Sequence, residues 1–216
     1  MPAPSASEIE NLAKAALQSA SLRGENAPDL AAALGNICGQ AFTLFVSLAM
    51  VAPGIPAAAP PPPGSGSTAG PGTLLPPPAG GPGASMIEPI AVGMLASHKI
   101  NGEKQGALAR AIAQSVEQAL LLFTSQVMVA PGMAIAGFAT TAPGNLMGAA
   151  PAKPMLQPLI LGFLQAGGIR GQNAPDLAGA MAETLSNALT QMMTRLKVTP
   201  GIPSSPGATA GPGRLV

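Results

Sequence analysis

Apolar residues recur at helical spacing in two kinds of segment, one short and one long, and each kind occurs three times. In the short segments an apolar side chain returns every three or four residues, which is the spacing of one helix face. They are Ile9, Leu12, Ala13, Ala16, Leu17 and Ala20 in the first, Ile87, Ile90 and Leu95 in the second, and Leu156, Leu159 and Leu164 in the third. This pattern predicts three short helices.

The long segments carry a second apolar stripe, whose members are separated by four, three, one, three and four residues. Such steps keep the stripe on one face of a helix. Alanine takes the third position of every stripe, so we expect the long helices to approach one another closely there. The stripes are Leu34, Cys38, Ala41, Phe42, Phe45 and Ala49, then Ile112, Val116, Ala119, Leu120, Phe123 and Val127, then Met181, Leu185, Ala188, Leu189, Met192 and Leu196.

Glycine, asparagine and proline mark the ends of the predicted helices. Asn26 and Asn173 are placed to cap two of the long helices, with a proline in the first turn. A glycine should stop each short helix, and a proline should end each long one because it lacks the amide hydrogen. The glycines are Gly24, Gly102 and Gly171, the first-turn prolines are Pro28 and Pro175, and the terminating prolines are Pro53, Pro131 and Pro200.

The segments belong to three copies of one unit. The sequence Val-Ala-Pro-Gly-Ile at 51–55 returns as Val-Ala-Pro-Gly-Met at 129–133 and as Val-Thr-Pro-Gly-Ile at 198–202. A second motif, [Gly/Ala]-Pro-Gly-x-Leu, follows each at 70–74, 142–146 and 211–215. The separation of 29 residues between Gly24 and Pro53 is the same in all three copies, which indicates an internal repeat. The copies run over 5–75, 84–147 and 153–216, with linkers at 76–83 and 148–152 and an insert around Pro60 to Ser67.

The expected fold is mainly α, with three tandem αα-hairpin repeats, each followed by an extended Pro/Gly-rich arm that has room for a short β-hairpin. One hairpin of this size cannot bury its own apolar stripe, but three together can, so we predict a six-helix bundle with pseudo-threefold character. The arms contain few side chains to bury. We expect them to project from the bundle, mobile when alone and ordered by neighbouring subunits.

Composition narrows the function. The chain has 27 Gly and 25 Pro among 216 residues, but 47% of its residues are hydrophobic and 9% are charged, which is unlike a disordered chain. A net charge of +1 and only five aromatic residues give no basis for binding nucleic acid. With no Trp, no Tyr and one His, the residues that build pockets and transfer protons are nearly absent, so we expect no enzyme and no cofactor.

The few residues with reactive side chains fit structural roles. Cys38 aligns with Val116 and Leu185, as a core residue would, and His98 has no second histidine with which to complete a metal site. We therefore predict no catalytic and no metal site. Glycine and serine at 64–67 are interpreted as linker, and Met181, Met192 and Met193 as core residues. The inter-helix turn and its caps are expected to contain Glu25, Asp29, Glu103 and Asp176. Arg23 and Arg170 are interpreted as solvated turn residues or as donors to a carboxylate or carbonyl.

One segment passes a first test for membrane insertion. No charged residue occurs between Leu30 and Met86, and the stretch 30–52 would span a bilayer as a helix. We interpret it as a core helix, since the aligned segments contain Glu117, Glu183 and Arg195; a membrane-associated protein that inserts 30–52 is the alternative. The chain start lacks the basic and apolar regions of a signal peptide, so we expect synthesis and accumulation in the cytoplasm of the host cell.

In each copy, helices are followed by Val-x-Pro-Gly-[Ile/Met] and then by [Gly/Ala]-Pro-Gly-x-Leu. This combination resembles structural virion proteins of tailed bacteriophages, particularly proteins of the tail and baseplate. The resemblance implies a virion location, with other structural subunits of the same particle as partners and threefold or sixfold symmetry around the chain. From the residues themselves we expect the Pro-Gly arms to contact those subunits. The arm residues concerned are Pro53, Gly54, Ile55, Pro71, Gly72, Pro131, Gly132, Met133, Pro143, Gly144, Pro200, Gly201, Ile202, Pro212 and Gly213.

Overall fold

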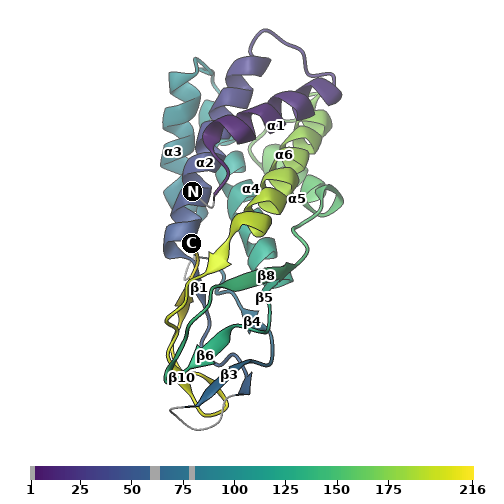
Figure 1. Cartoon of the computed structure of the whole chain (residues 1–216). Helices are drawn as coiled ribbons and strands as arrows, with labels where there is room; N and C mark the ends of the chain where they lie inside the picture. Colours follow the sequence, from purple (N-terminus) through teal and green to yellow (C-terminus); the bar gives the residue numbers. More distant parts are fainter. Residues whose placement is uncertain (1–2, 59–63, 78–80) are drawn as a thin grey trace.

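The computed structural model describes residues 3–58, 64–77 and 81–216. Within these ranges the chain forms six helices and twelve short strands. The helices occupy one end of an elongated molecule and the strands occupy the other (Figure 1). The fold is therefore mixed α/β, and the prediction of a mainly α protein is wrong, because the Pro/Gly-rich arms form paired strands.

The six helices come in three pairs, and each pair has a helix of 14 residues followed by one of 22. Six helices of these two kinds confirm the helical part of the sequence prediction. The bounds are α1 Ala6–Ser19, α2 Ala27–Leu48, α3 Ala84–Ser97, α4 Gln105–Gln126, α5 Lys153–Ala166 and α6 Ala174–Arg195.

The helices pack as a closed ring. Each short helix contacts the long helix that follows it, and α2 also contacts α3, α4 contacts α5, and α6 contacts α1. All residues of the three predicted long-helix stripes are buried. At the alanine positions Ala41, Ala119 and Ala188 the exposed fraction is 0%, so these small side chains lie in the tightly packed interior. One layer further along, the rings of Phe45 and Phe123 meet edge to face, with their centroids 6.0 Å apart.

The predicted ends of the short helices are corrected by three or more residues. These helices end at Ser19, Ser97 and Ala166, well before the glycines that were expected to stop them. The left-handed residue that follows each helix is Ser21, Lys99 or Gly168, with φ of 59°, 59° and 75°. The next amide donates back to the last turn, for example from Leu22 to the carbonyl of Leu17, so each helix ends in a Schellman motif.

The starts of the long helices lie where they were predicted, but the caps differ. Asn26 and Asn173 are the residues before α2 and α6, and both helices have proline in the first turn. Neither asparagine side chain accepts a hydrogen bond from the helix, so the predicted side-chain caps are not formed.

The twelve strands are two to five residues long and follow the long helices. Their bounds are β1 Met50–Val51, β2 Ala57–Ala58, β3 Ser65–Thr68, β4 Gly72–Thr73, β5 Val127–Val129, β6 Ala134–Ala136, β7 Ala139–Thr140, β8 Gly144–Gly148, β9 Lys197–Val198, β10 Ser204–Ser205, β11 Ala208–Thr209 and β12 Gly213–Arg214.

The strands close into two stacked rings. The proximal ring, next to the helices, runs β1, β4, β5, β8, β9, β12 and back to β1; single bridges from Val51 to Leu74 and from Val198 to Leu215 complete it. The distal ring runs β2, β3, β6, β7, β10, β11 and back, completed by bridges from Pro56 to Ala208 and from Ala139 to Pro203. All strand pairs are antiparallel, and through these pairs and single bridges each strand in the described ranges has a partner on both sides.

The three arms therefore do not project separately, as the sequence had suggested. Each arm pairs with the other two, which satisfies their backbone donors and acceptors inside one chain. The segment 64–67, interpreted as linker, is largely strand β3, which pairs with both β2 and β6. Residues 59–63 of the predicted insert and 78–80 of the predicted linker 76–83 lie outside the described residues.

Three buried threonines hold the arms together between the two rings. Thr68, Thr140 and Thr209 are 2–3% exposed, and each hydroxyl accepts a hydrogen bond of 3.0 Å from the backbone of the neighbouring arm. The donors are the amides of Met133, Ile202 and Ile55, in that order. Each threonine amide donates to the carbonyl of the same residue in return, so the contact is reciprocal.

Replacing Thr209 by valine should lower the free energy of unfolding by about 1–3 kcal/mol, because the buried amide of Ile55 then has no acceptor. Thr209→Ser keeps the acceptor and should cost less. The exposed Thr73→Val, in strand β4, is the matched control and should stay near the wild-type value. Urea denaturation followed by circular dichroism measures the differences, and a Thr209→Val protein as stable as wild type would contradict the role of the hydroxyl.

Candidate functional site

The arm residues predicted to bind neighbours fall into two classes in the structure. The proline of both motifs and the glycine of the first motif are exposed. The Ile or Met of the first motif and the glycine after the proline of the second motif are buried. The exposed residues are Pro53, Gly54, Pro71, Pro131, Gly132, Pro143, Pro200, Gly201 and Pro212; the buried ones are Ile55, Gly72, Met133, Gly144, Ile202 and Gly213. The buried side chains are used inside the ring, so only the nine exposed positions are available to another subunit.

Both glycines of each arm have a physical reason within the chain. Gly54, Gly132 and Gly201 have φ of 93°, 99° and 92°, a left-handed conformation that other residues rarely adopt. At Gly72 and Gly213 a Cβ atom would lie 2.7 Å and 2.6 Å from the Cδ1 atoms of Ile55 and Ile202, so the buried isoleucine needs glycine opposite it. The Pro-Gly motifs therefore build the rings, whatever else they contact.

Most of the strand half of the molecule is uncharged. None of the described residues at 49–58, 64–77, 127–152 and 198–213 is Asp, Glu, Lys, Arg or His. Phe138, in the turn between the distal-ring strands β6 and β7, is 70% exposed. Solvated protein surfaces are typically about 25–35% charged. The strand end thus presents a surface of small uncharged side chains.

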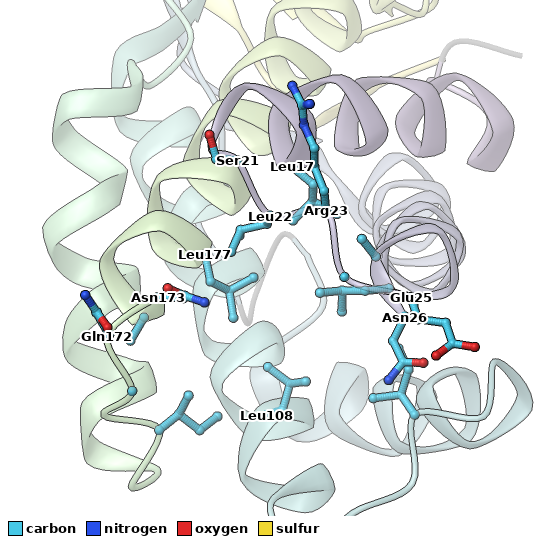
Figure 2. A pocket seen from close by; sticks show the side chains of 17 residues that line it. Leu17, Ser21, Leu22, Arg23, Glu25, Asn26, Leu108, Gln172, Asn173 and Leu177 are labelled. Atoms are coloured by element: carbon cyan, nitrogen blue, oxygen red, sulfur yellow. The ribbon is translucent and has the colours of Figure 1, made fainter.

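The opposite end of the molecule has an open depression of about 770 Å³, here called the axial depression. Apolar side chains that the repeat alignment equates line it from all three helix pairs. Figure 2 shows Leu22, Leu108 and Leu177 turned toward the same space from different elements. The apolar lining consists of Leu17, Leu22, Leu30, Ile100, Leu108, Ile169 and Leu177.

Polar groups surround the axial depression without forming a reactive site. Glu25, Asn26 and Asn173 lie on its rim, beside the starts of α2 and α6 (Figure 2). Arg170 donates from Nε to the carbonyl of Gln165 at 3.2 Å, so one of the two predicted turn arginines holds a helix C-terminal carbonyl. Glu25 and Glu103 are exposed, whereas Asp29 and Asp176 stand in the first turns of α2 and α6, where the helix dipole favours them.

Below the axial depression the molecular axis is filled. Leu34, Ile112 and Met181 from the three long helices, together with Cys38 and Val116 behind them, leave a void of only about 10 Å³. Cys38 is a free, buried cysteine, and burial raises the pKa of its thiol to about 12. The thiolate, which is the reactive form, is therefore suppressed at neutral pH. This agrees with the interpretation of Cys38 as a core residue.

Iodoacetamide at pH 7 should leave Cys38 unmodified in the folded chain and should label it fully after unfolding in guanidinium. The physical reason is that the thiol is both buried and protonated. Intact-mass spectrometry over time measures the labelling. Ser19→Cys, at the exposed end of α1, provides a positive control in the same protein, and labelling of Cys38 at the rate of that residue would contradict the core assignment.

His98 lies half-buried at the end of α3, and its Nε2 is 3.1 Å from Nδ2 of Asn36 on α2. The described part of the chain contains no group of three His, Cys, Asp or Glu side chains that could hold a metal ion. Met181 and Met192 are buried and Met193 is half-buried, as expected for residues of the core.

Among the described residues one helix, α2, is long and apolar enough to cross a membrane by length and composition. Half of its most apolar window is buried inside this structure, against the other helices. The stretch considered for insertion from the sequence, 30–52, is divided here between α2 and strand β1.

The structure brings together residues that the sequence had treated separately. The pattern predicted the apolar stripes, but the lining of the axial depression includes Leu22, Ile100 and Ile169, which follow the short helices and were not singled out. The alignment could have found them, since they occupy one position of the repeat.

No family model matches the chain, and neither the curated proteins nor the solved structures include a match to it.

Proposed function

We propose that the chain is a non-enzymatic structural component of a large symmetric assembly, built from three copies of one helical-hairpin-and-arm unit. The observation that carries this is the closure of the molecule: α6 contacts α1, and β12 pairs with β1. The contact between the third and first units thus repeats the contacts between the first and second and between the second and third. In this proposal one chain presents three related faces around an axis.

Such a molecule suits a position on a threefold or sixfold axis of a particle. Three identical neighbours can each contact one unit, while the sequence differences between the units make them distinguishable. The axial depression and the uncharged strand end lie at the two ends of the axis and would contact the subunits above and below. The exposed Pro-Gly corners, such as Pro53 and Gly54, face the flanking subunits.

The repeated Pro-Gly motifs resemble those of tail and baseplate proteins of tailed bacteriophages, and such particles contain threefold and sixfold axes. We therefore propose a virion location. The support lies in three features: a closed body, a large apolar depression at one end, and a strand end without charge. An apolar depression rimmed by polar groups marks an interaction site more often than a solvated surface. In the described ranges, neither end of the molecule holds a pair of acids, a nucleophile beside a base, or a set of metal ligands.

Quantitative mass spectrometry of particles purified from the native source tests the proposal. The chain should remain with the particles through a density gradient and should be present at one copy for every three, or every six, copies of the ring-forming subunit beside it. The reason is that one chain supplies three contact faces. Equal copy numbers of the chain and its neighbour, or absence of the chain from all particle fractions, would contradict it.

Replacing Leu108 by glutamate tests the axial depression itself. The charge should prevent the chain from joining the particle, since the apolar lining would no longer be complementary to an apolar partner. Leu108 is half-buried, so the isolated variant should still fold, as shown by circular dichroism. Asn11→Glu, on the exposed face of α1, adds the same charge away from the depression and should leave incorporation unchanged.

A further inference from the structure

Three joints connect the proposed units around the axis, and one of them differs from the other two. The chain itself links the first unit to the second and the second to the third. The joint between the third and first units, here called the seam, has no covalent link. It includes the contact between α6 and α1, the short antiparallel pair β12 and β1, and the hydrogen bonds between Thr209 and Ile55 in the arms.

The repeat alignment gives the residues at the other two joints that are equivalent to the two residues of an ion pair at the seam. At the first joint the alignment places Leu48, the last residue of α2, with Met86 near the start of α3. At the second joint it places Gln126 with Met155, and the Gln126 amide donates to the Met155 sulfur at 3.6 Å. At the seam the two positions hold Arg195 and Glu8. An uncharged pair at the linked joints is thus replaced by an ion pair where the link is missing.

The pair at the seam has bidentate geometry. Arg195 donates from Nη1 to Oε2 of Glu8 at 3.0 Å and from Nη2 to Oε1 at 2.7 Å. The Glu8 carboxylate also accepts from the backbone amide and the hydroxyl of Ser5, at 2.7 Å and 3.0 Å, as part of the capping box of α1. The carboxylate is therefore held in place before the arginine meets it. Hydrogen bonds from Arg195, and to a lesser degree from Ser5, lower the pKa of the Glu8 carboxyl to about 2, so Glu8 is ionised at neutral pH.

The described residues contain three other ion pairs, and none of them crosses a joint. Lys14 pairs with Glu10 within α1, Arg110 with Glu88 between α4 and α3, and Lys153 with Glu183 between α5 and α6. Each of these lies inside one unit. Arg195 and Glu8 are the pair that connects two units.

We infer that the Glu8–Arg195 pair is the specificity-determining contact of the seam, which makes the free face of α6 accept α1 and reject α3 or α5 of a second copy. This inference rests on the three-unit architecture proposed above. Because the units share one apolar stripe, apolar packing alone distinguishes poorly between them. A second copy that docked α3 or α5 on α6 would place Met86 or Met155 against Arg195 and leave the guanidinium without its carboxylate.

The role of such a pair is selection. An exposed ion pair stabilises little, but a like-charge contact or an unpartnered charge at a joint disfavours that pairing. Coiled coils use charged residues beside an apolar seam in the same way to choose partner and register. The outcome for this chain is a closed monomeric ring in place of open strings of misjoined copies.

Charge reversal tests the inference on the purified full-length chain. Glu8→Arg and Arg195→Glu each place like charges at the seam. In sedimentation velocity the monomer peak of each variant should shrink, and dimers and larger species should appear. The double reversal restores an opposite-charge pair and should restore the monomer. Glu88→Arg reverses the charge of another half-buried glutamate, whose ion pair lies inside one unit, and should remain monomeric. Arg195→Gln, which copies Gln126, should fall between wild type and the reversals.

Hydrogen exchange at single residues separates seam opening from general destabilisation. In the single reversals the amides of Met50, Val51 and Gly213 should exchange faster, since β1 and β12 meet at the seam. Amides of β4 and β5, at a linked joint, should keep their protection. The double reversal should slow exchange at the seam again, even though reversed charges at the helix ends lower overall stability.

Two results would overturn the inference: a double reversal that self-associates as much as the single variants, or single variants that expose all three joints equally. The experiment uses only the isolated chain. It therefore stands independently of the particle measurements, and a chain missing from every particle would contradict the proposed function without affecting the result at the seam.

Discussion

Closure of the ring is the constraint on which the rest of the structure depends. A pair of helices with one apolar stripe, such as α1 and α2, is too small to bury that stripe alone. Three pairs bury it around a common axis, where Ala41, Ala119 and Ala188 have no exposed surface. The same closure lets each arm pair with its two neighbours. Without the contacts between α6 and α1 and between β12 and β1, apolar side chains and strand edges would both be left open.

Glycine and proline have defined tasks in this arrangement. Each long helix ends five residues before the proline that was expected to stop it, and a strand of the proximal ring lies between them. The proline therefore follows that strand, and the glycine after it takes the left-handed turn. The second motif's glycine leaves room for the buried Ile55 or Ile202. The high content of these residues, which at first resembles disorder, reflects two closed strand rings built with very few large side chains. The three buried threonine contacts between arms fix how the two rings stack.

The ends of the axis differ in chemistry, and this difference supports a structural role. One end has an apolar depression lined by Leu22, Leu108 and Leu177; the other has the uncharged strands of the distal ring and an exposed Phe138. The sides carry the ion pairs, including Arg195 with Glu8 at the seam. The two ends of the molecule thus differ in chemistry, and the placement on a symmetry axis proposed above makes use of that difference.

The sequence by itself determined the six helices and the face that each long helix buries, because helical periodicity is a local signal. It did not determine the mixed α/β class, the pairing of the arms or the role of segment 64–67, since strands of two to five residues become stable only through partners far along the chain. It also missed the capping by Ser21 and Lys99, residues with no strong preference for a left-handed turn. The axial depression and the seam arise only when the third unit meets the first, and that contact is a property of the tertiary structure.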